Sequence, residues 1–563
     1  MKTILQLKKR LAMPQTSWQL CLLAAIGGLA SAMLVVMFVF ATEGIQSFYL
    51  SEKDDYSSLH SLSRFQLPII GAIVILIFAW LTGYKYIRTG IPFVLHRLKI
   101  ANGVMPLRNT INQFIGSTVA LAAGFSVGRE GPAVHLGAAC SSYIGNKLNL
   151  PYNAIRSLSA CGIAAGIAAC FNTPVAAVLF VMEVILREYK VHIFIPVMIA
   201  AIVGSMTTSS IFGPAHEFEN FTTITLNSQH YLTLVILGIV LGVIAFGFNR
   251  YLILIIKYSA RFHIVPRILT AAFITGALGF AVPYAMGTDL SAIDFSLQQN
   301  PQLQLLLGLL IAKILMTITA LGLGIPGGII GPILGIGAII GTCVSIIAMY
   351  FLPIESQASD YALMGMAGFM AATLNAPLAA LLCVVEMSNQ IEIIVPAMIV
   401  ITSSCIASGQ FFRNRSIFIM QLEVQGLAYR RPPIEKSLQR VGVIGVMQER
   451  LSLIADNDNK TIGEKLSTLA PHEHVIIKKE NQQQACEYIW CQPEHIDKDK
   501  ASQSLVRHKL IALNSQSTLA EAYLLLVRER VGGVYIYQNN PNDIMGIITF
   551  DAIRAYLLKG KTH

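Results

Sequence analysis

The sequence predicts an all-α polytopic membrane protein with a small α/β domain at its C-terminal end, and three observations lead to this fold class. Hydrophobic residues make up 54% of the 563 residues and charged residues only 13%, whereas a typical soluble protein carries roughly 25% charge. The apolar runs lie in the first 420 residues, and residues 420–563 are ordinary polar sequence. Two interrupted apolar stretches share the same motifs. The composition excludes a secreted disulfide-linked chain, a disordered chain and a nucleic-acid-binding protein.

Both ends of the chain are predicted to be cytosolic. Basic residues cluster beside the apolar spans, as the positive-inside rule expects, and they account for the formal net charge of +10. Those before the first span (about 18–40) are Lys8, Lys9 and Arg10, and those after the last span are Arg413, Arg415, Arg430 and Arg431. Residues 1–17 thus form a cytosolic segment and residues 42–64 an outer loop, and the number of crossings is even.

The nine cysteines indicate neither a disulfide framework nor a metal site. Seven of them lie in apolar stretches, where a cysteine is more often a small core residue. Cys486 and Cys491, in the polar tail, lack the spacing of metal ligands. We therefore expect no metal.

The predicted transmembrane domain covers residues 18–430. Its long spans after the first are placed at about 66–86, 192–212, 230–256, 268–288, 301–322 and 391–412. Residues 111–190 and 328–388 instead hold apolar runs of only ~10–18 residues, cut by Gly and Pro, and a full crossing needs ~20. Short helices are tolerated at membrane depth only where protein or a water-filled cavity surrounds their ends. These two stretches are therefore predicted to hold the functional site.

The two interrupted stretches also repeat each other. The paired motifs are GREGP at 128–132 with GIIGP at 328–332, and NTP at 172–174 with NAP at 375–377. In the second pair a glutamate, Glu183 or Glu386, stands 11 residues after the Asn. Corresponding broken segments in two halves of a membrane protein indicate a transport site at the repeat interface. We set the halves at about 66–212 and 230–412. The alternative, that Gly and Pro only permit close helix packing, does not favour repeating whole motifs.

The Gly-rich turns of these stretches suit an anion. An ion in hydrocarbon costs tens of kcal/mol unless its hydration is replaced. Turns that open helices present free backbone N–H groups and the positive end of the helix dipole. One helix end contributes at most ~2 kcal/mol, so several must converge. The chain offers three such turns, at residues 89–92, 128–132 and 327–332. A cation site would need carbonyls or several carboxylates around a cavity, and the acidic residues here are too scattered.

Glu130 stands between two glycines inside one of these anion-attracting turns. A carboxylate within the membrane is a functional candidate by default. Its negative charge can occupy the position of the anion, which would make it a gate that opens when it is displaced or protonated. The alternative is an ion pair with Arg129, but adjacent residues rarely face one another.

These motifs, taken in order, resemble the CLC family of chloride channels and proton/chloride antiporters over about residues 60–430. GREGP at 128–132 resembles the family's gating motif, TGIP at 89–92 its first anion-coordinating loop and GIPGGIIGP at 324–332 its third. The resemblance implies two inverted repeats of tilted, broken helices. It also implies a homodimer in the lipid bilayer with a separate pore in each subunit.

The resemblance carries residue roles with it. Glu130 would be the external gate, and chloride would be bound by backbone N–H groups near Arg129–Gly131 and Ile329–Ile330 and by the first loop. In that loop Thr89 stands where the family usually has Ser, and the Thr89 hydroxyl could still donate a hydrogen bond to the anion. The implied anion-binding residues are Thr89, Gly90, Ile91, Arg129, Glu130, Gly131, Ile329, Ile330 and Phe418.

Two positions depart from the family pattern. The antiporters have a Glu-Glu pair whose second member passes protons to the cytosol, but here Glu183 is followed by Val184. Valine cannot carry a proton, so this proton-pathway position resembles the family's channels. Phe418 occupies the position of a chloride-binding Tyr and lacks the hydroxyl, which is equally consistent with simple packing. His135 is expected to be a satisfied core histidine, and Lys313 to snorkel or to pair structurally.

Residues 431–563 are predicted to form a cytosolic domain. The segment from about 509 to 560 predicts a helix, two strands and a second helix, and it resembles the second member of a CBS-domain pair. The first copy, at about 440–482, is degenerate. In nucleotide-binding copies a Thr and a later Asp hold the ribose. Thr549 matches, but Asp551 comes one position early, so dimerisation and gating are favoured over binding of an adenine nucleotide.

The sequence therefore predicts chloride transport, channel-like or weakly proton-coupled and gated by Glu130. The neighbouring alternative is a strictly coupled proton/chloride antiporter, with protons as a second substrate. A membrane receptor that does not conduct ions belongs to another class, but it would leave the broken helices without a purpose. We expect an integral protein of the plasma (inner) membrane that is not an enzyme and requires no cofactor.

Overall fold

The computed structural model describes the chain except for part of the connections and tails. The residues outside the description are 1, 85–88, 214–229, 289, 297–301, 352–357, 428–432, 455–461, 463–472, 481–485, 494–504, 530–531 and 559–563. Arg430 and Arg431, which supported a cytosolic C-terminus, lie outside the described residues, as does much of the degenerate first CBS-like copy.

The chain forms two compact units, which we describe separately. The helical unit comprises Cys21–Ile144 and Ser157–Tyr429. The terminal unit comprises Met1–Leu20, Gly145–Arg156 and Arg430–His563. It thus combines both ends of the chain with a short stretch from the middle of the sequence.

The first half of the membrane part of the sequence is helical throughout. Its elements are α2 (Trp18–Gln46), η1 (Tyr56–Ser58), α3 (Ser61–Thr82), α4 (Gly90–Ile100), α5 (Leu107–Ala122), α6 (Glu130–Lys147), α7 (Tyr152–Phe171), α8 (Pro174–Phe180), the π-helix η3 (Val181–Leu186) and α9 (Val191–Phe212).

The second half is built in the same way. Its elements are α10 (Tyr231–Ser259), α11 (Ile264–Ala281), η5 (Pro283–Ala285), α12 (Leu290–Ser296), α13 (Leu303–Leu323), α14 (Ile330–Phe351), α15 (Ala358–Leu374), α16 (Pro377–Ser388), η6 (Ile391–Ile393), α17 (Ile394–Ile406), the π-helix η7 (Ala407–Phe411) and α18 (Ile417–Val424).

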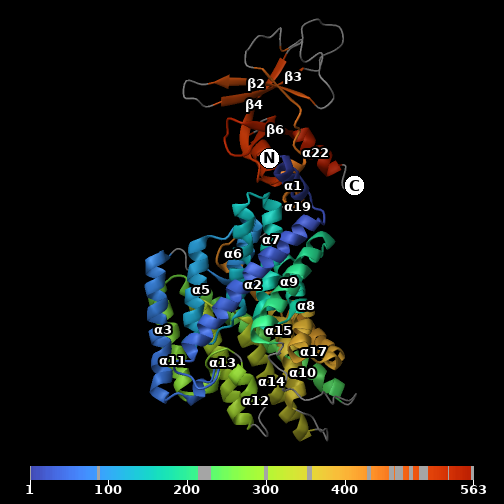
Figure 1. Cartoon of the computed structure of the whole chain (residues 1–563). Helices are drawn as coiled ribbons and strands as arrows, with labels where there is room; N and C mark the ends of the chain where they lie inside the picture. The colour runs from blue at the N-terminus through green and yellow to red at the C-terminus, as the bar shows by residue number, and fades with distance from the viewer. Residues whose placement is uncertain are drawn as a thin grey trace. The chain divides into compact units, whose positions relative to one another are not determined.

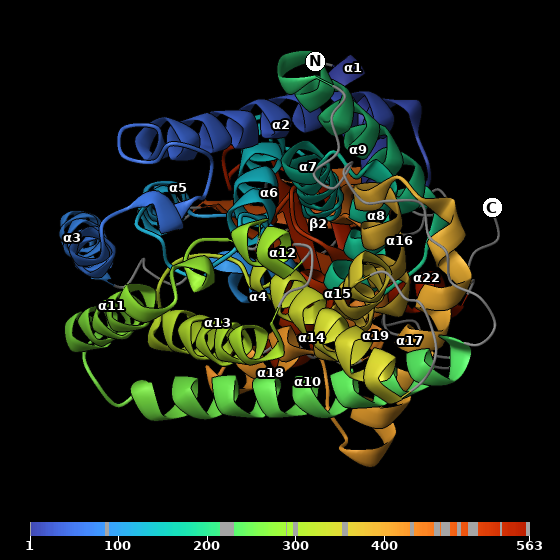
Figure 2. The ribbon, with the colours of Figure 1, turned by 90° about the horizontal axis from the view of Figure 1, so that it is seen from below.

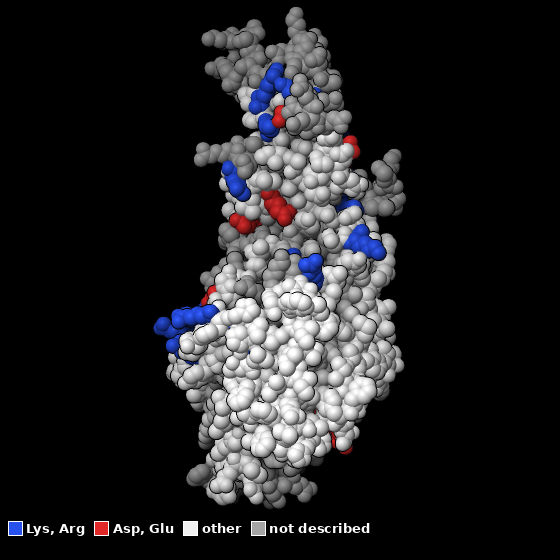
Figure 3. All heavy atoms as spheres, turned by 90° about the vertical axis from the view of Figure 1, so that its left-hand side faces the viewer, with Lys and Arg blue, Asp and Glu red and all other residues white. Residues whose placement is uncertain are grey.

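Among the described residues, nine helices are long and apolar enough to cross a membrane. Figure 2 shows α2, α3 and α10 at the edge of the helical unit and α6, α14 and α15 nearer its middle. On the face drawn in Figure 3 the helical unit presents a broad surface of uncharged side chains. The predicted polytopic architecture is confirmed, and Figure 1 gives the course of the chain.

Two helices of the interrupted stretches are longer than the sequence predicts. The helices α7 and α14 have 20 and 22 residues. In α14 the cause is that glycines continue the helix instead of breaking it. A Cβ at Gly337 would lie 2.5 Å from the Gly365 carbonyl oxygen of α15, so the missing side chain serves close helix packing. The first span is also longer than predicted, because α2 continues to Gln46.

The terminal unit contains α1 (Lys2–Ala12) and a six-stranded sheet in the order β1-β2-β3-β4-β5-β6. The strands are β1 (Leu451–Ile454), β2 (His474–Glu480), β3 (Cys486–Pro493), β4 (Leu505–Asn514), β5 (Gly533–Tyr537) and β6 (Ile544–Thr549). The helices of the C-terminal segment are α19 (Pro433–Leu438), η8 (Val443–Gly445), α21 (Leu519–Glu529) and α22 (Phe550–Leu558).

Strand pairing divides this sheet into two equivalent halves. In the first half β1 pairs parallel to β2 and β2 antiparallel to β3, and in the second half β4 pairs parallel to β5 and β5 antiparallel to β6. An antiparallel β3–β4 pair joins the halves. The elements α21, β5, β6 and α22 follow the predicted order of helix, strand, strand and helix. The first of these halves ends with β3, at Pro493.

Candidate functional site

The two repeated Gly turns meet each other in the middle of the helical unit. Gly128 and Gly328 form an antiparallel bridge in which each backbone N–H donates to the other residue's carbonyl oxygen at 2.8 Å. The turns that precede them match as well, since Phe125 donates to the Ala120 carbonyl as Ile325 does to that of Ala320. The helices α6 and α14 begin immediately after this bridge. The repeat in the sequence is therefore a physical pairing of two helix starts.

The carboxylate of Glu130 lies against the opposite turn. Its Oε1 accepts a hydrogen bond from the backbone N–H of Ile330, and the side chain is fully buried. A Cβ at Gly128 or Gly328 would overlap this carboxylate, so both glycines are needed for it to fit. Ile330 supplies one of the amides that the sequence assigned to an anion. The negative charge of Glu130 thus occupies the hydrogen-bonding position proposed for chloride.

A cavity of about 380 Å³ is lined by Gly131, the residue after Glu130, whereas Arg129, Glu130 and Ile330 are not among its lining residues. It brings together the three Gly-rich turns and one helix from the C-terminal end of the unit. Of the residues proposed to bind an anion, Thr89, Gly90, Ile91, Gly131, Ile329 and Phe418 line it. Thr89 is the N-cap residue of α4, but its side chain makes no capping hydrogen bond. The Thr89 hydroxyl is therefore not engaged with the backbone N–H groups at the start of α4. The buried ring of Phe418 lies on the cavity wall.

The cavity also contains polar residues that the motifs did not indicate. Arg267, from the first turns of α11, and Gln421, from α18, both line it. The Arg267 Nε atom is buried and has no hydrogen-bond partner among the described residues. A guanidinium group beside an anion cavity attracts anions by its charge. Sequence inspection missed Arg267 because a single arginine near a helix start looks like any charge at a membrane border.

The second pair of repeated motifs forms two matching helix junctions. Asn172 and Asn375 adopt the left-handed conformation, with φ of 54° and 55°, and end α7 and α15. A proline then occupies the first turn of α8 and of α16. This is the position at which the missing N–H of proline costs nothing. Asparagine tolerates the left-handed conformation better than most residues, which explains its place in both motifs.

The glutamates of these motifs cap each other's helices. Glu183, in η3, accepts hydrogen bonds from the backbone N–H groups of Leu378 (3.4 Å) and Ala379 (2.7 Å) at the start of α16. Glu386, in α16, accepts from Val175 (3.0 Å) and Ala176 (2.7 Å) at the start of α8. A carboxylate at a helix N-terminus satisfies free donors and complements the helix dipole.

Three other polar positions were considered in the sequence. His135 is fully buried in α6 and stacks on Phe93, but neither ring nitrogen has a hydrogen-bond partner among the described residues. The expectation of a satisfied core histidine is therefore wrong. Lys313 does pair structurally and does not snorkel, because its buried amine donates to the carbonyls of Ala285, Gly287 and Thr288. Val184 is buried beside Glu183 in η3.

A buried carboxyl group joins the connection between α2 and α3 to the segment after η5. Asp54, between α2 and α3, accepts hydrogen bonds from the Thr288 backbone N–H and hydroxyl. Burial raises the pKa of Asp54, whereas the Thr288 hydrogen bonds and the charges of Arg129 and Lys313 lower it.

The residues considered for a nucleotide lie in the terminal unit. The Thr549 hydroxyl accepts a hydrogen bond from the Ala552 backbone N–H at 3.2 Å and so serves as a cap for α22. Asp551 is exposed in the first turn of that helix. No group of three or more potential metal-ligating side chains occurs within the described part of the chain.

A comparison with protein families finds one match in the membrane part of the sequence. Residues 70–409 match the family model described as "Voltage gated chloride channel". Among curated proteins, the chain is 27% identical over 435 residues to the H(+)/Cl(-) exchange transporter ClcA of Citrobacter koseri. That alignment covers 73% of this chain and 90% of the relative.

Solved structures share the fold at lower sequence identity. A slow cyanobacterial Cl-/H+ antiporter superposes with a TM-score of 0.64 at 21% identity, covering 73% of this chain and 98% of that one. A eukaryotic CLC transporter superposes with a TM-score of 0.62 at 19% identity. This superposition covers 95% of this chain and 97% of the transporter chain, so the likeness extends into the terminal unit.

Proposed function

The chain belongs to the CLC family of anion transport proteins, and from this membership we propose that it conducts chloride, passively or with weak proton coupling, through a pathway gated by Glu130. The observation that carries the proposal is the hydrogen bond from the Ile330 amide to the Glu130 carboxylate. A backbone amide that binds a carboxylate also suits a halide, because both are anions that replace hydration with N–H donors. Chloride and the gate therefore compete for one position.

The proposed pathway has the electrostatics that a dehydrated anion needs. The starts of α4, α6 and α14 meet around the cavity and the Glu130 carboxylate. Each helix start contributes at most ~2 kcal/mol, and together they offset part of the cost of removing water from the ion. Arg267 adds a full positive charge to the cavity wall. When Glu130 is protonated or swings away, its place on the Ile330 amide becomes available to chloride.

Weak coupling is favoured by the residues near the proposed proton entry. Val184 has no group that can hold a proton. The carboxylate of the preceding Glu183 accepts hydrogen bonds from two backbone amides of α16 and so serves as a helix cap. The apolar side chain of Val184 therefore carries the argument for weak coupling at this position.

Strict proton/chloride antiport is the second candidate. The curated relative at 27% identity is named as an exchange transporter. The chain also holds a buried imidazole, His135, on the helix that begins with Glu130. Histidine side chains take part in proton relays within membrane proteins, so strict antiport here would need an inward proton route through a group such as His135.

Paired measurement of chloride and proton flux separates the two candidates. The purified protein is reconstituted into liposomes that hold a chloride gradient, and both ions are followed with electrodes. Our proposal expects chloride efflux with little or no uphill proton movement. Stoichiometric proton uptake against its gradient would select the antiporter instead. The variant His135→Phe, which keeps an aromatic ring to stack on Phe93, should abolish any proton movement that runs through the imidazole.

The terminal unit and the assembly are part of the same proposal. We take residues 431–563 to be a CBS-like pair, supported by the two equivalent half-sheets β1–β3 and β4–β6. The protein would be a homodimer of the plasma (inner) membrane with both termini in the cytosol. The basic residues before α2 support that orientation. Binding of an adenine nucleotide at Thr549 and Asp551 is less favoured, because Thr549 already caps α22.

A further inference from the structure

A second cavity is lined only by residues of the terminal unit, and it shares no lining residue with the cavity of the helical unit. It has a volume of about 930 Å³, which is within the usual range for small-molecule sites. We call it the N-terminal pocket and define it by its fourteen lining residues, which come from the end of α1, the α1–α2 connection, the start of α2 and the segment after α19. They are Lys9, Arg10, Met13, Gln15, Thr16, Ser17, Trp18, Gln19, Ile444, Gly445, Met447, Gln448, Glu449 and Arg450.

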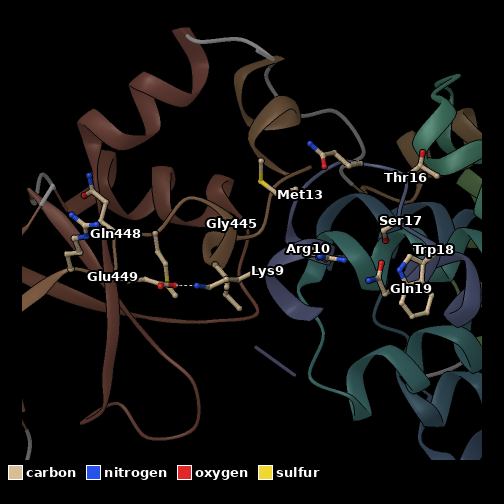
Figure 4. Close-up of a pocket in the computed structure, with 14 residues that line it drawn as sticks. Lys9, Arg10, Met13, Thr16, Ser17, Trp18, Gln19, Gly445, Gln448 and Glu449 are labelled. Carbon is tan, nitrogen blue, oxygen red and sulfur yellow. Dashed lines mark ion pairs between the residues drawn. The ribbon is translucent and has the colours of Figure 1, made fainter. Parts of the chain in front are cut away.

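The charge of this pocket is positive. Lys9, Arg10 and Arg450 line it together with a single acidic residue, Glu449. Lys9 and Glu449 form an ion pair across the pocket, with side chains that are 36% and 44% exposed (Figure 4). Two positive charges remain in excess. The positive-inside rule explains basic residues next to α2. It does not explain Arg450, which belongs to a segment more than 400 residues after the start of α2 in the sequence.

The walls of the pocket are held in place by hydrogen bonds. The Gly442 N–H donates to the Ala12 carbonyl at 2.9 Å. Asn153 donates to the carbonyls of Leu11 (2.8 Å) and Ala12 (3.1 Å). The end of α1 is therefore fixed to the segment that carries Gln448–Arg450. A site that is formed before binding loses less entropy when a ligand enters.

One side of the pocket is suited to phosphate. Ser17 caps α2 by accepting from the Leu20 N–H at 3.2 Å, so the positive end of this 29-residue helix lies at the pocket. When the Gln19 side-chain amide is oriented with its oxygen toward Trp18 and Arg10, this oxygen accepts hydrogen bonds from the Trp18 indole (3.1 Å) and from the Arg10 guanidinium (3.2 Å). Figure 4 shows Ser17, Trp18 and Gln19 together on this side. Arg10 uses one of its five donors there, and a guanidinium binds phosphate oxygens in pairs.

The opposite side is suited to a hydroxyl group. The Gln448 side-chain oxygen is buried and has no hydrogen-bond partner among the described residues. A buried acceptor of this kind is costly unless a donor reaches it. A ligand that carries hydroxyl groups next to its phosphate would satisfy both sides of the pocket at once.

We propose that the N-terminal pocket binds a phosphate ester that carries free hydroxyl groups. The phosphate lies between Arg10 and the start of α2, the charge of Arg450 adds to the positive potential of the pocket, and a hydroxyl donates to Gln448. Two sources share this chemistry: a soluble nucleotide and the headgroup of an anionic lipid such as phosphatidylglycerol. Trp18 is 70% exposed at the first residue of an apolar helix, where it can stack on a base or lie among lipid headgroups. The proposal does not depend on how chloride transport is coupled.

Tryptophan fluorescence tests occupancy of the pocket directly. The chain has three tryptophans, Trp18, Trp80 and Trp490, so the full-length variant W80F/W490F reports on Trp18 alone. One arm titrates ATP into the protein in phosphatidylcholine nanodiscs. The other arm compares phosphatidylcholine nanodiscs with nanodiscs that contain phosphatidylglycerol and no ATP. A saturable change in the first arm identifies a soluble phosphate ester, and a change only in the second identifies a lipid headgroup.

Charge variants decide whether the signal comes from the pocket. Arg450→Gln and Arg10→Gln should each weaken the response about tenfold, because each removes one of the two positive charges in excess. Glu449→Gln should strengthen it about fivefold, since it removes the one negative charge and releases Lys9. This gain of affinity cannot be produced by misfolding. The matched control Arg554→Gln, on the exposed face of α22, should change nothing. Thr549→Ala should also leave the response intact, which separates this pocket from the CBS-like position.

Two results would overturn the proposal. One is the absence of any Trp18 response in both arms. The other is a response that stays the same in the variants of Arg10, Arg450 and Glu449.

Discussion

At the residue scale, the central feature is a single carboxylate held by a backbone amide. Glu130 is fully buried, and the Ile330 N–H donates to it from the opposite repeat. A buried charge without such a donor would cost several kcal/mol. The glycines at 128 and 328 leave the space for this arrangement. Any side chain at these two positions would push the carboxylate away from the amide.

Neutralising Glu130 tests its role as the gate. Glu130→Gln keeps the shape of the side chain but removes the charge that competes with chloride. We expect chloride flux at least as high as in the native protein and nearly constant between about pH 3 and 7, a range that contains the whole titration of an ordinary Glu, whose pKa is about 4.3. Liposome flux at several pH values is the measurement. Glu392→Gln, on an exposed residue of η6, is the control and should keep the native pH dependence. An unchanged pH profile in Glu130→Gln would remove this residue as the gate.

Arg267 is expected to draw chloride into the cavity. Arg267→Gln removes a positive charge from the cavity wall, and we expect chloride flux at low ionic strength to fall about tenfold. The loss should shrink as salt increases, because salt screens the attraction. Arg267→Lys should keep most of the flux. Arg261→Gln, on an exposed arginine of the neighbouring α10–α11 connection, is the matched control. Equal flux in Arg267→Gln and Arg261→Gln would show that the Arg267 charge is not used.

At the element scale, the two repeats are joined by reciprocal helix caps. Glu183 caps α16 and Glu386 caps α8, with one hydrogen bond of 2.7 Å in each case. The sequence predicted that these glutamates are equivalent, because each stands 11 residues after its Asn. It did not reveal that each one serves the helix of the other repeat. Spacing along the chain describes one segment, whereas a cap across the repeats depends on how two segments pack.

Removal of either cap should destabilise the helical unit to a similar extent. Glu183→Ala and Glu386→Ala each leave two amide donors at a helix start without their carboxylate, at a cost of about 1 kcal/mol. The thermal unfolding midpoint of the purified protein is the measurement, and Glu392→Ala is the control. A loss of stability in Glu183→Ala that Glu386→Ala does not share would contradict the reciprocal arrangement.

The length of the repeated helices was also decided by packing between elements. Glycine weakens a helix interior by roughly 1 kcal/mol when the helix is isolated. On that basis the glycines of α14 predict interruptions, but Gly337 and Gly341 lie so close to the backbone of α15 that a Cβ would overlap it. The packing that they permit compensates for their low helix propensity, and the helix continues for 22 residues.

At the scale of the whole molecule, the prediction that matters most is the oligomeric state. One chain has a mass of 61.3 kDa. We expect light scattering of the detergent-solubilised protein, corrected for bound detergent, to give the mass of two chains. A single-chain mass under conditions that retain chloride flux would show that the homodimer is not required.

The division of the chain into units also shows a limit of sequence analysis. Composition separates the apolar part from residues 431–563. However, the terminal unit also includes Met1–Leu20 and Gly145–Arg156. The second of these is the α6–α7 turn, where the Tyr152 N–H donates to the Gln516 carbonyl at 2.7 Å. Nothing in the local sequence of that turn indicates its partner, because the contact joins residues more than 350 positions apart.

The sequence by itself determined the membrane class, the order of the helices, the repeated motifs and the identity of Glu130 as a charge among anion-attracting glycines. These features are local, since hydropathy, Gly and Pro act on the segment that contains them. Only the tertiary structure decided that the Ile330 amide binds Glu130, that Arg267 lines the same cavity, that the glutamate caps cross between the repeats and that a basic pocket forms around Arg450. Each of these depends on which surfaces meet when distant segments bury their apolar faces, and that choice is made by the packing of the whole chain.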